Sequence, residues 1–160
     1  MNQFEDLTFG KISMIIDDIV NGEADSKEAK YLYEYFIFLN KNNMSAPKEL
    51  IEFYENAKKE IFCGKKSIAQ AFGFKKKRGR AREKERIIPC VVDVMENILQ
   101  GFSKEDAIRL SIEKFPKVPS SIKENFDNYK EDAIHILKLK IILDGDKLDS
   151  YNFSLLDKYL

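Results

Sequence analysis

Six basic side chains fall within eight residues near the middle of the chain. They are Lys75, Lys76, Lys77, Arg78, Arg80 and Arg82. Lysine and arginine bind phosphate groups and displace their counterions, and Gly79 lets a backbone come close to a ligand. The stretch therefore predicts contact with the phosphates of a nucleic acid. Two other interpretations remain open: a solvated charged segment, or a patch that docks on an acidic protein surface.

Charge is unevenly distributed, although the formal net charge of the chain is zero. Residues 75–86 contain eight Lys/Arg and two Glu, which gives a local charge of +6. The other residues hold 27 − 8 = 19 basic and 27 − 2 = 25 acidic side chains, a charge of −6. A zero net charge argues against a protein that coats nucleic acid over its whole surface. The asymmetry predicts local contact through one cationic segment instead.

A second polar group begins the last of three helices that we expect between residues 91 and 132. This group consists of Ser120, Ser121 and Lys123. The spacing is similar to a helix-turn-helix, in which the first side chains of the second helix reach base edges. The connector at residues 116–119 is longer than the usual turn, and acids such as Asp127 would repel phosphates. Simple helical packing is therefore the other interpretation.

No motif in the sequence supplies catalytic or cofactor chemistry. His135 is the only histidine and has no cysteine at ligand spacing, so we expect no metal site. Cys63 and Cys90 lack a CxxC pattern, and we expect two buried thiols rather than a disulfide. There is no Walker A motif and no dinucleotide fingerprint. The sequence predicts a protein that is not an enzyme and binds no cofactor.

Helical periodicity runs through most of the chain, and β-type alternation is absent. Apolar residues recur at helical spacing in residues 9–20, 26–39, 47–61, 68–72, 87–99, 103–115 and 121–143, and a short helix is expected in the tail. The expected fold class is therefore all-α, a compact bundle of about seven to eight helices with a helix-turn-helix-like C-terminal half. We expect an N-terminal bundle at 1–64, a basic connector at 65–86 and a C-terminal half at 87–160. A single domain spanning 1–160 is the alternative.

Pro89 lies inside an apolar helical pattern that starts at Ile87. Proline lacks the N–H that a helix interior needs. We therefore expect the helix to begin at Pro89, with Ile87 and Ile88 as an extended lead-in. A helix that begins earlier and is kinked at Pro89 is the alternative.

One predicted helix carries more aromatic residues than one face can hold. They are Tyr31, Tyr33, Tyr35, Phe36 and Phe38. Some of these rings must be exposed or meet another surface. This leaves open a homodimer or an interface with a partner protein.

The run Ser67-Ile68-Ala69-Gln70-Ala71-Phe72-Gly73-Phe74, followed by Arg78-Gly79-Arg80, resembles a short pattern in uncharacterised helical proteins of bacterial prophages and other mobile elements. The resemblance implies a mobile-element context. Our first hypothesis is a regulatory or accessory nucleic-acid-binding protein. The alternative is a phage-encoded inhibitor of a host defence complex, anti-CRISPR-like in role. Without a signal peptide or a long apolar run, we expect a cytoplasmic protein and no membrane contact.

Overall fold

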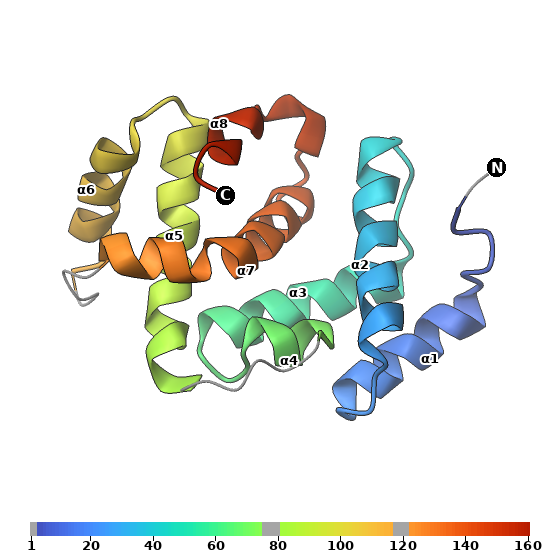
Figure 1. The fold of residues 1–160 in the computed structure, drawn as a ribbon. Coiled ribbons are helices and arrows are strands. Elements are labelled where there is room, and N and C mark those ends of the chain that lie inside the picture. Colours follow the sequence, from blue (N-terminus) through green and yellow to red (C-terminus); the bar gives the residue numbers. More distant parts are fainter. Residues whose placement is uncertain (1–2, 75–80, 117–121) are drawn as a thin grey trace. The chain divides into compact units, whose positions relative to one another are not determined.

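The computed structural model describes residues 3–74, 81–116 and 122–160, and these residues form an all-α structure (Figure 1). Their elements are α1 (Phe9–Val20), α2 (Ser26–Lys41), α3 (Lys48–Phe62), α4 (Ile68–Phe72), α5 (Ala81–Leu99), α6 (Lys104–Lys114), α7 (Ile122–Leu143), the 3₁₀ turn η1 (Leu148–Ser150) and α8 (Ser154–Asp157). The predicted fold class is confirmed. The chain divides into two compact units, Met1–Gly79 (unit 1) and Arg80–Leu160 (unit 2). The connector expected at 65–86 spans this division.

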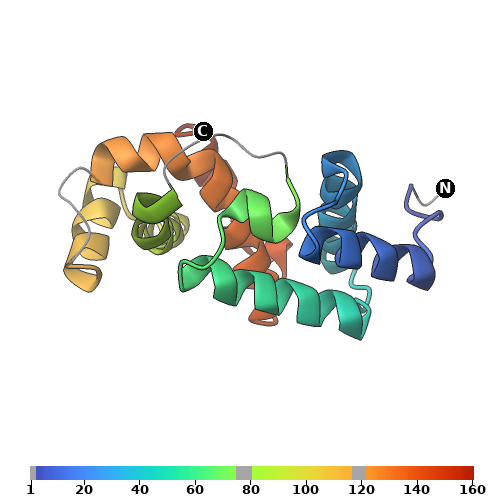
Figure 2. The same cartoon turned by 90° about the horizontal axis from the view of Figure 1, so that it is seen from below.

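Capping side chains fix where the helices of unit 1 begin. The Thr8 hydroxyl accepts a hydrogen bond from the backbone N–H of Lys11, and the Asp25 carboxylate accepts one from Lys27. Ser67 and Gln70 form a reciprocal capping box at the start of α4. These bonds satisfy N–H groups that the first helical turn leaves unpaired. The single turn of α4 therefore has a defined start, and it lies alongside α3 (Figures 1 and 2).

Aromatic rings from three helices form the core of unit 1. Tyr33 of α2 stacks on Phe72 of α4 with 5.6 Å between ring centroids. Tyr54 of α3 lies 4.8 Å from Phe36 and 5.8 Å from Phe72. Burial raises the pKa of the Tyr33 and Tyr54 hydroxyls well above the ordinary value, because the charged form is poorly solvated there. One half of the aromatic stripe on α2 is thus part of this core.

The other half of the stripe is covered by residues just before α1. The Phe4 side chain is only 3% exposed, and its ring centroid lies 4.9 Å from that of Tyr31. Tyr35 and Phe38 are at 5.3 and 5.1 Å from the same ring. The second surface that the stripe requires is therefore supplied by the chain itself. The width of the stripe gives no argument for a homodimer, which stays a prediction.

Unit 2 is built around α5, which packs against both α6 and α7 (Figure 1). Val91 and Met95 of α5 are fully buried, as are Ile136 and Leu137 of α7. The Ser103 hydroxyl accepts a hydrogen bond from the backbone N–H of Asp106 and so caps α6. The expected cap and the apolar periodicity of these helices are confirmed.

The expectation that a helix begins at Pro89 was wrong, because α5 starts at Ala81 and contains Pro89 in its interior. Proline inside a helix costs about 3 kcal/mol. Ile87 and Ile88 are only 5% and 4% exposed in the helical conformation. Burying an isoleucine side chain contributes about 1.5–3 kcal/mol, so the two together offset the cost of the proline.

Both cysteines are free thiols, but only Cys90 is buried. Burial raises the pKa of the Cys90 thiol to about 11. Cys63 is exposed, so the expectation of two buried thiols was wrong for this residue. It follows the last buried residue of α3, Ile61, and caps the end of that helix. His135 is partly buried, as expected. None of the helices among the described residues is long and apolar enough to span a membrane.

Candidate nucleic-acid interface

Most of the predicted basic segment lies outside the described residues. Lys75, Lys76, Lys77, Arg78 and Arg80 belong to this part. Arg82 is the second residue of α5; its backbone is helical, and its side chain is also outside the described part. The buried residues that the structure describes run up to Phe72 and resume at Ile87. The division between the two units falls between Gly79 and Arg80, inside the basic segment.

Basic residues also occupy the first two turns of α5. They are Arg82, Lys84 and Arg86. The N-terminus of a helix carries a partial positive charge, so a cation there costs about 0.3–1 kcal/mol. Arg82 and Arg86 are also four residues apart, a spacing at which like charges repel. Glu83 and Glu85 offset only part of this charge.

The aromatic residues beside the basic segment differ in accessibility. The Phe72 side chain is 1% exposed and belongs to the core of unit 1, so it is not free to stack on a base. Phe74 is partly buried and lies 5.9 Å from Tyr33, with the ammonium of Lys30 6.0 Å from its ring centroid. Proteins that bind single strands present aromatic rings for base stacking. Phe72 therefore cannot supply such a ring.

Of the second predicted group, only Lys123 lies among the described residues; Ser120 and Ser121 do not. Lys123 is exposed in the first turn of α7. Asp127, one turn further on, forms ion pairs with Lys104 at 3.2 Å and with Lys130 at 3.8 Å. The repulsion that this acid would exert on a phosphate is therefore reduced.

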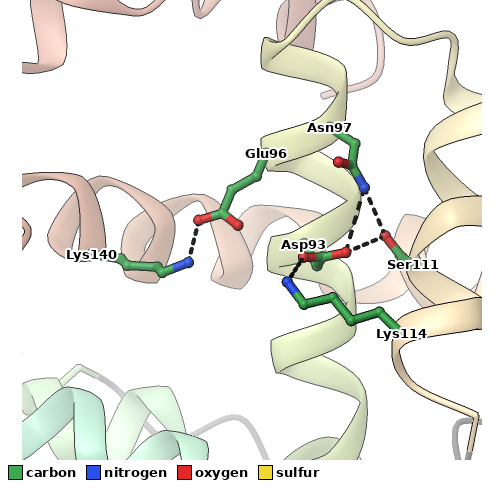
Figure 3. Close-up of polar contacts among 6 residues, drawn as sticks. All are labelled: Asp93, Glu96, Asn97, Ser111, Lys114 and Lys140. Atoms are coloured by element: carbon green, nitrogen blue, oxygen red, sulfur yellow. Dashed lines mark hydrogen bonds and ion pairs between the residues drawn. The ribbon is translucent and has the colours of Figure 1, made fainter.

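A polar network that the sequence analysis missed holds α6 and α7 on α5 (Figure 3). Asp93 of α5 accepts a hydrogen bond from the Ser111 hydroxyl at 2.8 Å and pairs with the Lys114 ammonium at 2.7 Å. Asn97 donates to Ser111 at 3.2 Å, and Glu96 pairs with Lys140 of α7. The signal that could have revealed the network is a single acid within the apolar run Val91–Met95.

The network is suited to positioning and not to catalysis. Ser111 is 0% exposed and Asp93 is 7% exposed, so neither can meet a substrate. The hydrogen bond and the charge of Asp93 raise the pKa of Lys114, which keeps that side chain cationic. Buried polar groups with satisfied partners favour one packing arrangement of the helices. The network therefore fixes how α6 and the last turn of α7 lie on α5 within unit 2.

Replacing Asp93 with alanine is expected to lower the free energy of unfolding by about 2 kcal/mol, because Ser111 loses a buried acceptor and Lys114 its partner. Urea denaturation followed by circular dichroism measures the loss. The matched control is Asp106→Ala, whose carboxylate pairs with Arg109 at an exposed site. Exposed ion pairs contribute about 0–1 kcal/mol, so equal losses in the two variants would contradict the role given to Asp93.

Among the described residues, no group of three or more His, Cys, Asp or Glu side chains is arranged to hold a metal ion. Comparisons of the chain with protein-family models, with curated proteins and with solved structures found no match.

Proposed function

We propose that this protein binds nucleic acid through phosphate contacts made by the basic segment Lys75–Arg82, and that it is not an enzyme. The observation that supports the proposal is the placement of six cations within eight residues at the division between two compact units. Each unit contains its own buried core on either side of the segment. The cations are therefore not explained by folding, and binding is the role that their chemistry fits.

The start of α5 extends the run of basic residues along the chain. This run includes Arg82, Lys84 and Arg86 in the first two turns of α5. The N-terminus of a helix favours bound anions because of its partial positive charge. In unit 2, the exposed Lys123 supplies a further phosphate contact, and Ser120 and Ser121 are proposed as backbone or base-edge contacts. In this proposal α6 and α7 act as a helix-turn-helix-like pair, and the contacts of Asp93 set the position of α6 on α5.

We place this activity in the cytoplasm and in a mobile-element context, as a regulatory or accessory role. The alternative, an anti-CRISPR-like inhibitor that docks on an acidic surface of a host protein, stays a prediction. Both hypotheses use the same cations but different partners. The two hypotheses are therefore distinguished by whether the protein still binds a partner after nucleic acid has been removed.

The test is fluorescence anisotropy with a short labelled DNA duplex and a single strand of the same length. We expect saturable binding with a dissociation constant of about 1–100 μM at physiological salt, the range of non-specific phosphate binding. A pull-down from bacterial lysate with and without nuclease accompanies it. The absence of DNA and RNA binding, together with a protein partner retained after nuclease treatment, would overturn the proposal in favour of the inhibitor.

A further inference from the structure

The outward side of α1 carries large apolar side chains that unit 1 leaves exposed. Phe9 is 69% exposed, Met14 51% and Val20 60%. They are three of the six large apolar side chains that are exposed among the described residues, although α1 has only 12 residues. The inward side of α1 consists of isoleucines that are buried in unit 1. Exposed apolar side chains gathered on one element are typical of an interface with another chain.

Two pairs of residues border this outward side along its length. An α-helix makes one turn in about 3.6 residues. Phe9 and Val20 are separated by close to three turns, so they lie along one edge of the outward side. Lys11 and Asp18 are separated by close to two turns and lie along the opposite edge. Met14 lies between the two edges.

The two pairs have the same midpoint, which lies between residues 14 and 15 of α1. A second copy of α1 can pack antiparallel on the first, with a two-fold axis that passes between the helices at this midpoint. Each edge then meets the same edge of the other copy in reverse order. Phe9 therefore meets Val20 of the partner subunit. On the opposite edge, Lys11 meets Asp18 of the partner subunit.

The charges on α1 favour this antiparallel arrangement. Asp18 forms no ion pair with a described residue. Lys11 pairs with the exposed carboxylate of Asp6 at 3.2 Å, but its ammonium has three N–H donors and can also contact a second acid. Parallel packing would instead place Asp18 beside its own copy, and like charges disfavour it. Antiparallel packing also brings the positive end of each helix dipole beside the negative end of the other.

We propose that the outward side of α1 is the contact surface of a homodimer, in which two copies of α1 pack antiparallel about a two-fold axis between Met14 and Ile15. Helices of this length bury less area than the roughly 1,600 Å² of a standard interface, so we expect a weak dimer with a dissociation constant of about 0.1 mM. The contact lies within unit 1 and does not use the basic segment. The inference therefore does not depend on nucleic-acid binding.

The test is sedimentation equilibrium of the full chain between about 10 μM and 1 mM, which brackets the expected constant. A reducing agent is present because Cys63 is an exposed thiol. The double substitution Phe9→Ala and Val20→Ala is expected to weaken dimerisation by at least about tenfold, because both side chains lose apolar contact area. The matched control is Phe102→Ala, which removes a 45% exposed ring from unit 2 and should leave the dissociation constant unchanged.

A charge exchange tests the antiparallel register. Lys11→Glu alone places like charges together at both ends of the contact and should weaken dimerisation by about tenfold. Combining Lys11→Glu with Asp18→Lys restores opposite charges across the axis and should recover most of the lost affinity. Both variants lose the ion pair with Asp6, so recovery in the second variant cannot come from that contact. Circular dichroism establishes that each variant keeps its helical content. If the alanine variant does not fold, the charge exchange decides alone.

Three results would overturn the proposal. The first is a wild-type chain that stays monomeric at about 1 mM, which would leave this side of α1 to a different partner. The second is a dimer that a folded alanine variant does not weaken, or that Phe102→Ala weakens to the same extent. The third is equal weakening in the two charge variants.

Discussion

Replacing Gly73 with alanine is expected to lower the free energy of unfolding of unit 1 by about 3 kcal/mol, from backbone strain and overpacking together. Gly73 ends α4 in the left-handed conformation, with φ of +77°. A Cβ atom added there would lie 2.7 Å from Cγ1 of Ile19 and 3.0 Å from Cβ of Ala29. The first distance is shorter than any relaxed contact, so the Ile19 side chain or the backbone around Gly73 must shift. Urea denaturation gives the loss, and hydrogen exchange should show it in α2 and α3.

The matched control for this prediction is Gly22→Ala. Gly22 has nearly the same backbone angle, φ of +75°, but an added Cβ would meet no atom within 4 Å. This variant therefore carries only the backbone cost, about 1–2 kcal/mol. The difference between the two variants measures the close packing of α4 against α1 and α2. Equal losses would show that Gly73 is needed for its backbone angle alone.

Neutralising the basic segment is expected to have the largest effect on binding. In the variant, all six residues from Lys75 to Arg82 that carry charge become glutamine. Six lost phosphate contacts should weaken duplex binding by about 10³-fold or more at low salt. The buried residues that the structure describes lie outside this stretch, and we expect the unfolding curve to be unchanged. Anisotropy with the labelled duplex measures the binding, and circular dichroism the folding.

A second variant separates the position of the charge from its amount. It carries glutamine at six exposed lysines elsewhere: Lys27, Lys41, Lys48, Lys59, Lys147 and Lys158. Both variants lose six positive charges, so a general effect of net charge would weaken binding equally in the two. We expect the second variant to retain affinity within about tenfold, since long-range charge is screened beyond about 10 Å at moderate salt. Equal loss in both would contradict the assignment of the site.

The elements of this fold could be predicted from the sequence because their signals are local. Thr8, Ser67 and Ser103 each cap the helix that follows, and apolar spacing identifies the buried faces. The start of α5 could not be predicted from Pro89 alone. Its position depends on the burial of Ile87, and burial is a property of the folded unit.

The contacts that position the sites were less predictable, since they join residues far apart in sequence. Phe4 and Tyr31 meet across 27 positions, and Asp93 and Ser111 across 18. The sequence contains an acid in an apolar run and an excess of aromatic residues on one helix. Neither pattern identifies the distant residues that these side chains contact. The basic segment differs, because its proposed role rests on composition and needs no partner within the chain.

The most direct test of phosphate binding by the basic segment is the salt dependence of duplex affinity for the wild type and the glutamine variant of that segment. Six phosphate contacts by the basic segment should contribute about −5 to the slope of log K against log salt for the wild type. Between 50 and 200 mM salt, affinity should therefore fall by about 10³-fold. The glutamine variant should lose this contribution and show a slope shallower than that of the wild type by about 5. A wild-type slope near zero, or the same steep slope in the variant, would contradict the account.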